Sequence, residues 1–234
     1  MKYIFCNFFL ILILSFTTYA QKGEITSSNQ IKVIYEYSHS ISEETTFDVL
    51  LYFTESNSQY VYHSERKKVK LDGGLTYTSP FHSYFNNYNF NNKDIEENRI
   101  LDNGTTLYAT WNNNLVWEIS DEEKIIGNYR VRKATTESIE LDRENPFYAG
   151  KVTAWFCPDI PIPSGPARYY GLPGLIIELK YQKDGGSYRL KSIEEDDDYK
   201  FKEITTKNQV DKEDVIYYNH KNPQIIKELK KNKK

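Results

Sequence analysis

The sequence predicts a mainly β protein, an antiparallel meander that forms a curved sheet, half-barrel or sandwich with a short C-terminal helix. Aromatic residues make up 15% of the 234 residues, and the 20 tyrosines among them are typical of strands. Apolar side chains recur at every second position in several segments, as they do in half-buried strands. One central stretch, residues 157–173, is so rich in proline and glycine that a helix is excluded there.

The first 20 residues are typical of a cleavable signal peptide. Lys2 precedes an apolar run, and Thr18 and Ala20 place small residues at the two positions that a signal peptidase reads. The run is about nine residues long, whereas a membrane-spanning helix needs roughly 20. We therefore expect residues 1–20 to be removed on export, which leaves no transmembrane segment. Residues 21–234 should form a single β-rich domain in the periplasm, on the inner face of the outer membrane or outside the cell.

Charge and cysteine content argue against some functions. The formal net charge is −3, and −4 without Lys2, so the basic excess that nucleic-acid binding requires is missing. Loss of Cys6 with the signal peptide would leave Cys157 alone, without a partner for an intramolecular disulfide. A reactive thiolate needs a histidine or basic neighbour, and the nearest basic residues in sequence are Lys151 and Arg168. We expect Cys157 to be buried and unreactive.

The first half of the chain contains alternating segments. A turn at 56–58 and a returning strand at 59–63 should follow the first two segments and complete a three-stranded meander. The side chains expected to share one buried face are Ile31, Val33, Tyr35 and Tyr37 in the first segment, and Phe47, Val49, Leu51 and Phe53 in the second.

Residues 80–92 break the alternation with aromatic rings set among asparagines. We expect an irregular surface loop or sheet edge whose rings cap the sheet, and the alternative is a stacking platform for sugars or bases. Strands should resume at 105–111 and 115–119, paired as a hairpin with a tryptophan on each arm, and continue through 124–136.

The centre of the chain should consist of two strands, 152–156 and 175–181, joined by a stiff connection that is poor in backbone hydrogen bonds because proline lacks a donor. Tight turns are predicted at 164–166 and 172–174, with the glycines at positive φ. A β-branched residue at Gly171 or Gly174 should then destabilise the fold. A hairpin turn at 184–186 and a strand at 187–193 should follow.

This central stretch carries a family resemblance. Residues 171–176, GLPGLI, resemble the name-giving motif of the GLPGLI family, a group of exported proteins of Gram-negative bacteria whose function is unknown. The AWF sequence at 154–156 and the preceding block from Trp117 to Ala134 are also similar to that family. The resemblance implies an exported, β-rich protein of GLPGLI type and supplies no catalytic residue. The structural motif consists of Trp155, Phe156, Pro161, Gly165, Pro166, Gly171, Leu172, Pro173, Gly174, Leu175 and Ile176.

The C-terminal part changes character. Five consecutive carboxylates at 194–198 lack the glycine of a calcium loop, so a solvated turn is expected there. A last strand is predicted at 199–204 and a short helix at 224–230, where Asn222 and Pro223 form a good helix start. The basic end, 227–234, should be a solvated terminus; contact with an acidic membrane surface is the alternative.

Catalytic, cofactor-binding and metal-binding patterns were not found in the sequence. The four histidines do not have metal-ligand spacing, and a site built from His39, His63 and Cys157 would lack a fourth ligand. Three functions remain. The first is a non-enzymatic exported binding or carrier protein for an apolar ligand such as a lipid or peptide. The second is an accessory protein that docks on an outer-membrane partner, and the third is a secreted hydrolase with an unrecognised site.

Overall fold

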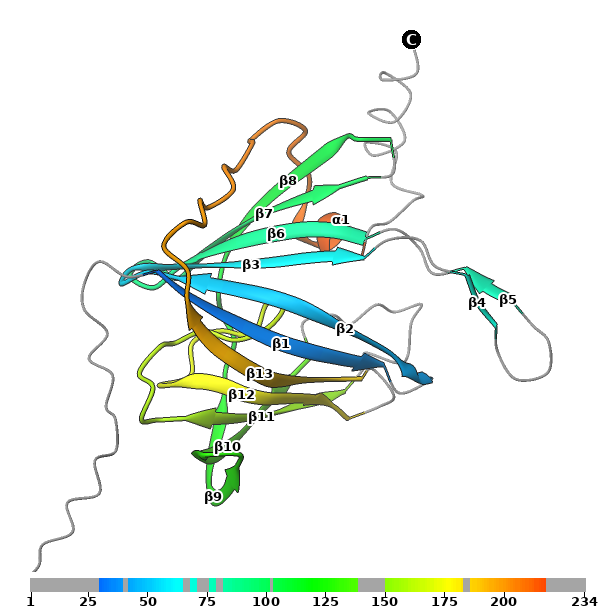
Figure 1. Cartoon of the computed structure of the whole chain (residues 1–234). Coiled ribbons are helices and arrows are strands. Elements are labelled where there is room, and N and C mark those ends of the chain that lie inside the picture. Colours follow the sequence, from blue (N-terminus) through cyan, green and yellow to red (C-terminus); the bar gives the residue numbers. More distant parts are fainter. Residues whose placement is uncertain are drawn as a thin grey trace, which may run out of the picture.

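A computed structural model describes residues 30–39, 42–64, 68–70, 76–78, 82–101, 103–138, 150–182 and 186–217. These residues form an eleven-stranded antiparallel sheet, a separate two-stranded sheet and one short helix (Figure 1). The expected signal peptide, most of the expected hairpin turn at 184–186 and the expected helix at 224–230 lie outside the described residues.

The large sheet consists of two meanders. Its strands in spatial order are β8 (Thr106–Asn112), β7 (Asp94–Ile100), β6 (His82–Asn89), β3 (Asn57–Ser64), β2 (Ser42–Phe53), β1 (Ile31–His39), β13 (Ser187–Glu195), β12 (Leu175–Tyr181), β11 (Lys151–Cys157), β10 (Tyr129–Glu137) and β9 (Glu118–Ile126). Pairing of β1 with β13 joins the two halves. The small sheet contains β4 (Lys68–Lys70) and β5 (Thr76–Thr78), and the helix is α1 (Lys212–Tyr217).

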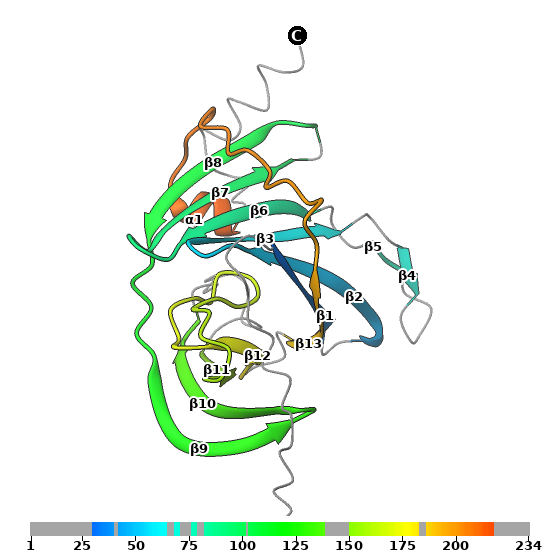
Figure 2. The same cartoon turned by 60° about the vertical axis from the view of Figure 1, so that its left-hand side comes forward.

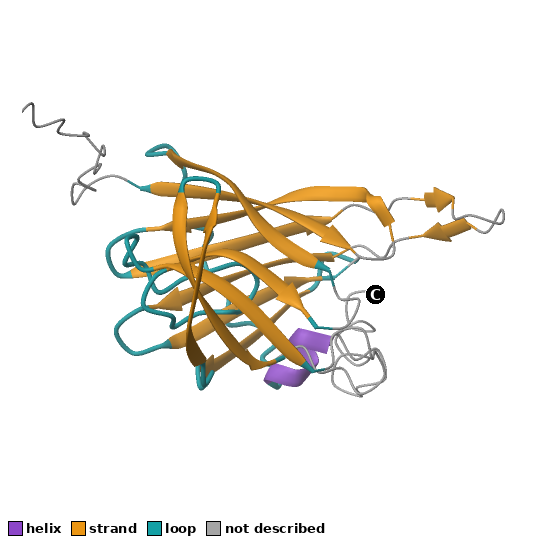
Figure 3. Cartoon of the chain, turned by 90° about the horizontal axis from the view of Figure 1, so that it is seen from below, coloured by secondary structure: helices purple, strands orange, loops and turns teal. Residues whose placement is uncertain are grey.

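The connection between the two edge strands forces the large sheet to curve. β8 and β9 lie at opposite edges but follow each other in sequence, separated only by residues 113–117. An extended residue spans at most about 3.6 Å, so the ends of the two strands lie within about 22 Å of each other. The sheet therefore curls until its halves face each other, as Figures 2 and 3 show, but its edges do not pair and it stays open. This confirms the predicted curved meander.

The alternation seen in the sequence places the core on the concave face. Ile31, Val33, Tyr35 and Tyr37 are all buried, as predicted, while the residues between them are only partly covered. In β2 the predicted face is also buried, with Phe47 only partly covered at its margin. Apolar residues of β10 to β13 complete the same core from the opposite side.

Residues 82–89 form a strand between β3 and β7, so the loop or sheet edge predicted there is wrong. The side chain of Tyr84 is buried in the core, and Tyr88 packs on Tyr170. Between them, the Nδ2 of Asn86 donates to the carbonyl oxygen of Ala167 at 3.3 Å. This tertiary bond satisfies an asparagine that has a low intrinsic preference for strands.

Two other local predictions are also corrected, and one helix was not predicted. Residues 105–119 do not form a hairpin, because Trp111 lies in β8 at one edge and Trp117 lies in the connection to β9 at the other. Residues 199–204 are not a strand, since side chains rather than a neighbouring backbone hold them. The described helix is α1, at 212–217, which the sequence did not predict. No helix in the described ranges is long and apolar enough to cross a membrane.

Candidate functional site

Most of the predicted motif lies in the segment that packs against the concave face of the sheet. Residues 158–174, here called the crossing segment, connect β11 to β12 and run through the space enclosed by the two halves of the sheet (Figure 2). Every residue from Ser164 to Tyr170 is buried. The concave face is therefore occupied by the chain itself.

A buried ion pair holds the crossing segment against β7. Arg168 donates through Nε to Glu97 Oε2 at 2.7 Å and through Nη2 to Glu97 Oε1 at 2.6 Å. Both side chains are almost fully buried, with 2% of Arg168 and 0% of Glu97 exposed. The guanidinium also lies 4.5 Å from the centre of the Tyr84 ring, a cation–π distance. Removing one member of such a pair would leave a buried charge without compensation.

Buried hydroxyl groups provide further anchors. The Tyr35 hydroxyl donates to the carbonyl oxygen of Ile176 at 2.7 Å, and Ser164 Oγ donates to Ser58 Oγ at 2.9 Å. The Tyr170 hydroxyl donates to Asn86 Oδ1. Burial raises the pKa of Tyr35 and Tyr170 well above their ordinary value, so both hydroxyls remain protonated donors.

Several backbone hydrogen bonds link the crossing segment to itself and to the start of β12. The amide of Gly171 donates to Pro163 O, that of Leu175 to Ile160 O and that of Ile176 to Ser164 O. The prolines lack donors at their own positions, but amides between them, such as those of Ile160, Ile162 and Ser164, donate to nearby backbone carbonyl oxygens. The segment is stiff because its prolines fix φ and its backbone hydrogen bonds link one part of it to another.

The three motif glycines have different roles. Gly171 takes φ +93°, as predicted, whereas Gly165 and Gly174 do not take positive φ. They are required for space. A Cβ on Gly174 would lie 2.2 Å from the carbonyl oxygen of Cys157, and a Cβ on Gly165 would lie 2.5 Å from Ile176 Cδ1. The predicted first turn lies at 166–169, where Ala167 has φ +58°.

The other motif residues divide into core and surface positions. Core positions fix the crossing segment between β11 and β12, while surface prolines stiffen its exposed bends. Buried members are Phe156, Pro166, Leu172, Leu175 and Ile176. Pro161 and Pro173 are exposed, and Trp155 is partly covered, with Lys124 Nζ 4.0 Å from its ring centre.

A second segment covers the convex face. Residues 196–211, here called the strap, leave β13 and pass over β3, β6 and β7 to reach α1 (Figures 1 and 2). Gln59 bonds both the amide and the carbonyl of Lys202 at 2.9 Å, and Asn98 bonds both groups of Thr205 at 2.8 Å. Both amide side chains are fully buried. Each replaces the missing backbone partner of the strap.

The strap then closes one edge of the sheet. The amide of Tyr108 in β8 donates to Asn208 O at 3.2 Å, and the amide of Val210 donates to Tyr108 O at 2.9 Å. Beyond this bridge, Val210 and Val215 pack on Leu107. The β8 edge is thereby paired at Tyr108 and covered beside it, which hinders pairing with another chain there.

The opposite edge, β9, is open in the described structure. Its only backbone partner there is β10, and Ile125 is 67% exposed. Acidic side chains of this strand are partly neutralised within the sheet, since Asp121 pairs with Arg132 and Glu122 with Lys133. Such an edge is a template for strand addition.

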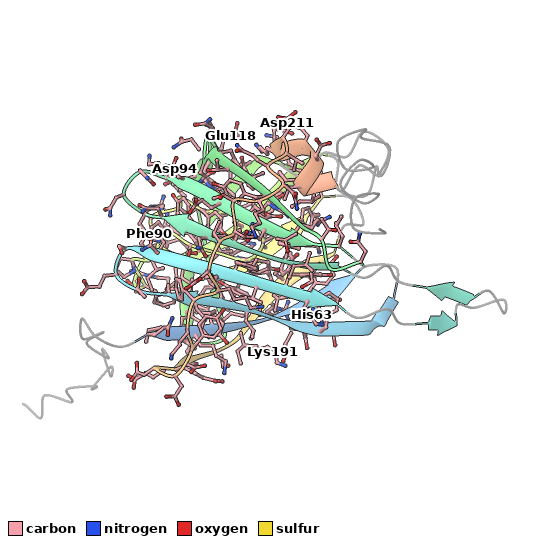
Figure 4. All side chains as sticks on the ribbon, turned by 90° about the horizontal axis from the view of Figure 1, so that it is seen from above. His63, Phe90, Asp94, Glu118, Lys191 and Asp211 are labelled. Carbon is pink, nitrogen blue, oxygen red and sulfur yellow. The ribbon has the colours of Figure 1, made fainter. Side chains whose placement is uncertain are left out.

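A polar hollow of about 400 Å³ lies on the convex face beside the strap. Its walls come from the turn end of β6 and β7, and Figure 4 shows Asp94 at this end and His63 toward the other. The lining residues are Asn57 in β3, Asn87 and Asn89 in β6, Asn92 in the following turn, Asp94 and Glu96 in β7, Thr110 in β8 and Phe201 in the strap. The sequence prediction missed this hollow. The period of two in residues 84–89 is the signal that could have found its β6 wall.

Titratable groups form no metal cluster in the described part of the chain, where no three His, Cys, Asp or Glu residues come together. His63 and Cys157 lie on β3 and β11, and four strands of the sheet separate them. Burial raises the pKa of the Cys157 thiol, which opposes thiolate formation. Burial alone would raise the pKa of Glu178, but hydrogen bonds from Lys124 and Arg189 lower it overall.

Fold and site together define a class of protein: an open, curved antiparallel sheet that is filled by its own crossing segment. A protein-family model described as "Protein of unknown function (Porph_ging)" matches residues 143–178, which include this segment. A comparison with curated proteins found no similar sequence.

Two solved structures resemble the chain, those described as PNGF-II in the C2 space group and in the P21 space group. Their TM-scores are 0.51 and 0.52 at 14% and 13% sequence identity. Each comparison covers 81% of this chain and 33% of the other, so the chain spans about a third of the length of PNGF-II. At this identity the likeness concerns the fold alone.

Proposed function

We propose that this chain is a non-enzymatic docking protein of the bacterial cell envelope, of GLPGLI type and exported by a signal peptide at residues 1–20. Its open β9 edge would receive an extended segment of an outer-membrane partner. The observation that carries the proposal is the contrast between the two edges. The strap pairs with β8, whereas β9 presents unpaired backbone groups in the described structure.

The carrier alternative receives less support from the geometry. A carrier of lipid or apolar peptide needs an apolar cavity, and the concave face is filled by the crossing segment. The hollow on the convex face is polar. The hydrolase alternative stays last, because the described residues form no metal-binding cluster that would favour it.

The side chains of β9 indicate the chemistry of the partner. Charged residues on an edge usually prevent pairing, but three of the four acids here are bound to cations of the same sheet: Asp121, Glu122 and Glu118. Glu123 has no ion pair in the described structure, and Ile125 is exposed. The partner segment should therefore be extended, with apolar side chains and a basic residue to meet Glu123.

Export is supported by the sequence of the first 20 residues and by the resemblance of residues 171–176 to the GLPGLI motif. The periplasm, the inner face of the outer membrane and the exterior of the cell all suit a protein of this kind. The expected N-terminal residue of the mature protein is Gln21, which mass spectrometry of the protein purified from its host would test.

Site-specific photocrosslinking tests the docking edge. A photoreactive amino acid at Ile125 should yield a crosslinked partner in cells of the host, whereas the same group at Lys200, an exposed strap position, should not. Adding Ile125→Lys to a chain that carries the photoreactive group at Glu123 should reduce that crosslink, because a lysine opposes burial of the edge. Equal crosslinking from positions 125 and 200 would contradict the proposal.

A further inference from the structure

The polar hollow is a surface built by strand register. Asn87 lies directly opposite Glu96, which lies opposite Thr110, so three polar side chains form one row across β6, β7 and β8. Asn89 lies two residues further along β6 and therefore on the same face. Directly opposed Cβ atoms are about 5 Å apart, a spacing that lets adjacent side chains bind neighbouring groups of one ligand.

Four side chains in the hollow share one feature: one of the two polar atoms at the end of the side chain is hydrogen-bonded, and the second has no bond within the described structure. They are Asn87, Asn89, Asp94 and Glu96. Asn87 Oδ1 accepts from Gln59 Nε2 at 2.6 Å, and Asn89 Oδ1 accepts from the amide of Asn91 at 2.9 Å. Glu96 Oε1 accepts from the Tyr108 hydroxyl at 3.1 Å.

Asp94 is the fourth of these side chains, and its Oδ1 accepts from Asn112 Nδ2 at 3.2 Å. The side chains are therefore oriented in advance, and the hollow offers amide donors beside carboxylate acceptors. Fixed donors and acceptors lower the ordering cost of binding.

One ring completes the hollow. Phe201 belongs to the strap, whose backbone is fixed on its C-terminal side by the two bonds of Lys202 to Gln59. Tyr199, two residues before Phe201, stacks on Tyr52 with ring centres 3.4 Å apart. The phenyl ring is therefore held beside the polar row.

The chemistry of the lining selects a ligand class. Neither carboxylate has an ion-pair partner in the described structure, and the lining contains no cation, so anionic ligands are disfavoured. The strands beneath the hollow pair with one another, which leaves no backbone edge there for a peptide. A sugar ring offers hydroxyls that both donate and accept, and a C–H face that packs on an aromatic ring.

We propose that the polar hollow binds a neutral saccharide, with Phe201 stacking on a sugar ring. Asn87 and Asn89 donate to its hydroxyls, and Asp94 and Glu96 accept from them. This site lies on the convex face and is separate from the β9 edge.

Calorimetric titration of the purified protein with cellotetraose, chitotetraose and mannotetraose tests the assignment. At least one of these sugars should bind saturably at concentrations up to about 10 mM. Phe201→Ala should raise its Kd about tenfold, and Phe201→Tyr should restore binding because the flat ring returns. Glu96→Gln, which keeps the shape of the side chain, should also weaken binding.

Matched controls are Lys200→Ala, next to Phe201 in the strap, and Asn128→Ala, an exposed asparagine in the β9–β10 turn. Both should bind as the wild type does. Thermal unfolding of each variant separates loss of binding from loss of fold. The proposal is overturned if none of the three sugars binds, if Phe201→Ala binds like Lys200→Ala, or if tetraglycine binds in their place.

Discussion

Gly174 provides the sharpest test of how the crossing segment is built. An added Cβ would lie 2.2 Å from the carbonyl oxygen and 2.7 Å from the carbonyl carbon of Cys157, at the end of β11. Ordinary contacts of this kind are about 3.5 Å or longer, so the backbone has to move by more than about 1 Å. The neighbouring core leaves little room for that movement, because Phe156 and Leu175 are fully packed.

The expected cost of Gly174→Ala follows from this geometry. Overpacking a core costs about 1–3 kcal/mol, and the upper end applies because the obstacle is backbone. A loss of about 3 kcal/mol is a large part of the 5–15 kcal/mol that stabilises a typical domain. For a chain of this size it corresponds to a fall in Tm of about 6–12 °C.

Gly127→Ala is the matched control. Gly127 has φ +58° and nothing within 4 Å of an added Cβ, so its substitution costs only backbone strain, about 1 kcal/mol. Urea unfolding followed by tryptophan fluorescence would measure both variants. If the two variants unfold at the same urea concentration, the close approach of Gly174 to Cys157 is not what the fold requires.

Three further predictions concern buried or paired groups. Arg168→Met should cost about 3–5 kcal/mol in unfolding free energy by leaving Glu97 uncompensated, and the double variant with Glu97→Leu should regain part of that loss; equal stability of single and double variants would contradict the buried pair. Wild type should have a larger free energy of unfolding than Glu178→Gln, and this difference should be full above the ordinary carboxyl pKa of 4.5. It should decline as the pH falls through the lowered pKa of Glu178 in the folded state. A difference that does not change from about pH 7 to about pH 2 would refute the ion pairing. Cys157 should react with iodoacetamide at least about 100-fold more slowly in folded than in urea-unfolded protein, and comparable rates would show an accessible thiol.

Local patterns were reliable where one face of a strand meets the core. The alternation of Ile31, Val33 and Tyr35 identified the buried face of β1, and the apolar start of 175–181 identified β12. The same reasoning failed at 82–89, because Asn86 in this strand donates a hydrogen bond to Ala167 of the crossing segment, which lies far away in sequence. It failed again at 105–119, where two strands that are adjacent in sequence lie at opposite edges.

The motif was found from the sequence, but its physical role was not. Proline and glycine indicated a stiff, non-helical segment, and Gly171 takes the predicted positive φ. That the segment fills the sheet depends on Arg168 meeting Glu97. No local rule pairs residues so distant in sequence. The polar hollow could not be predicted from local patterns either, because its walls come from several strands and from the strap.

The sequence by itself therefore determined the β class, the strands with a clean period of two and the stiffness of the crossing segment. These properties depend on neighbours along the chain, through φ restriction and the alternation of side chains. Only the tertiary structure decided which strands are neighbours, which edge is covered and what fills the concave face. Those outcomes depend on pairing and burial between distant residues, and the resulting stabilisation is gained only when the whole sheet has curled around its core.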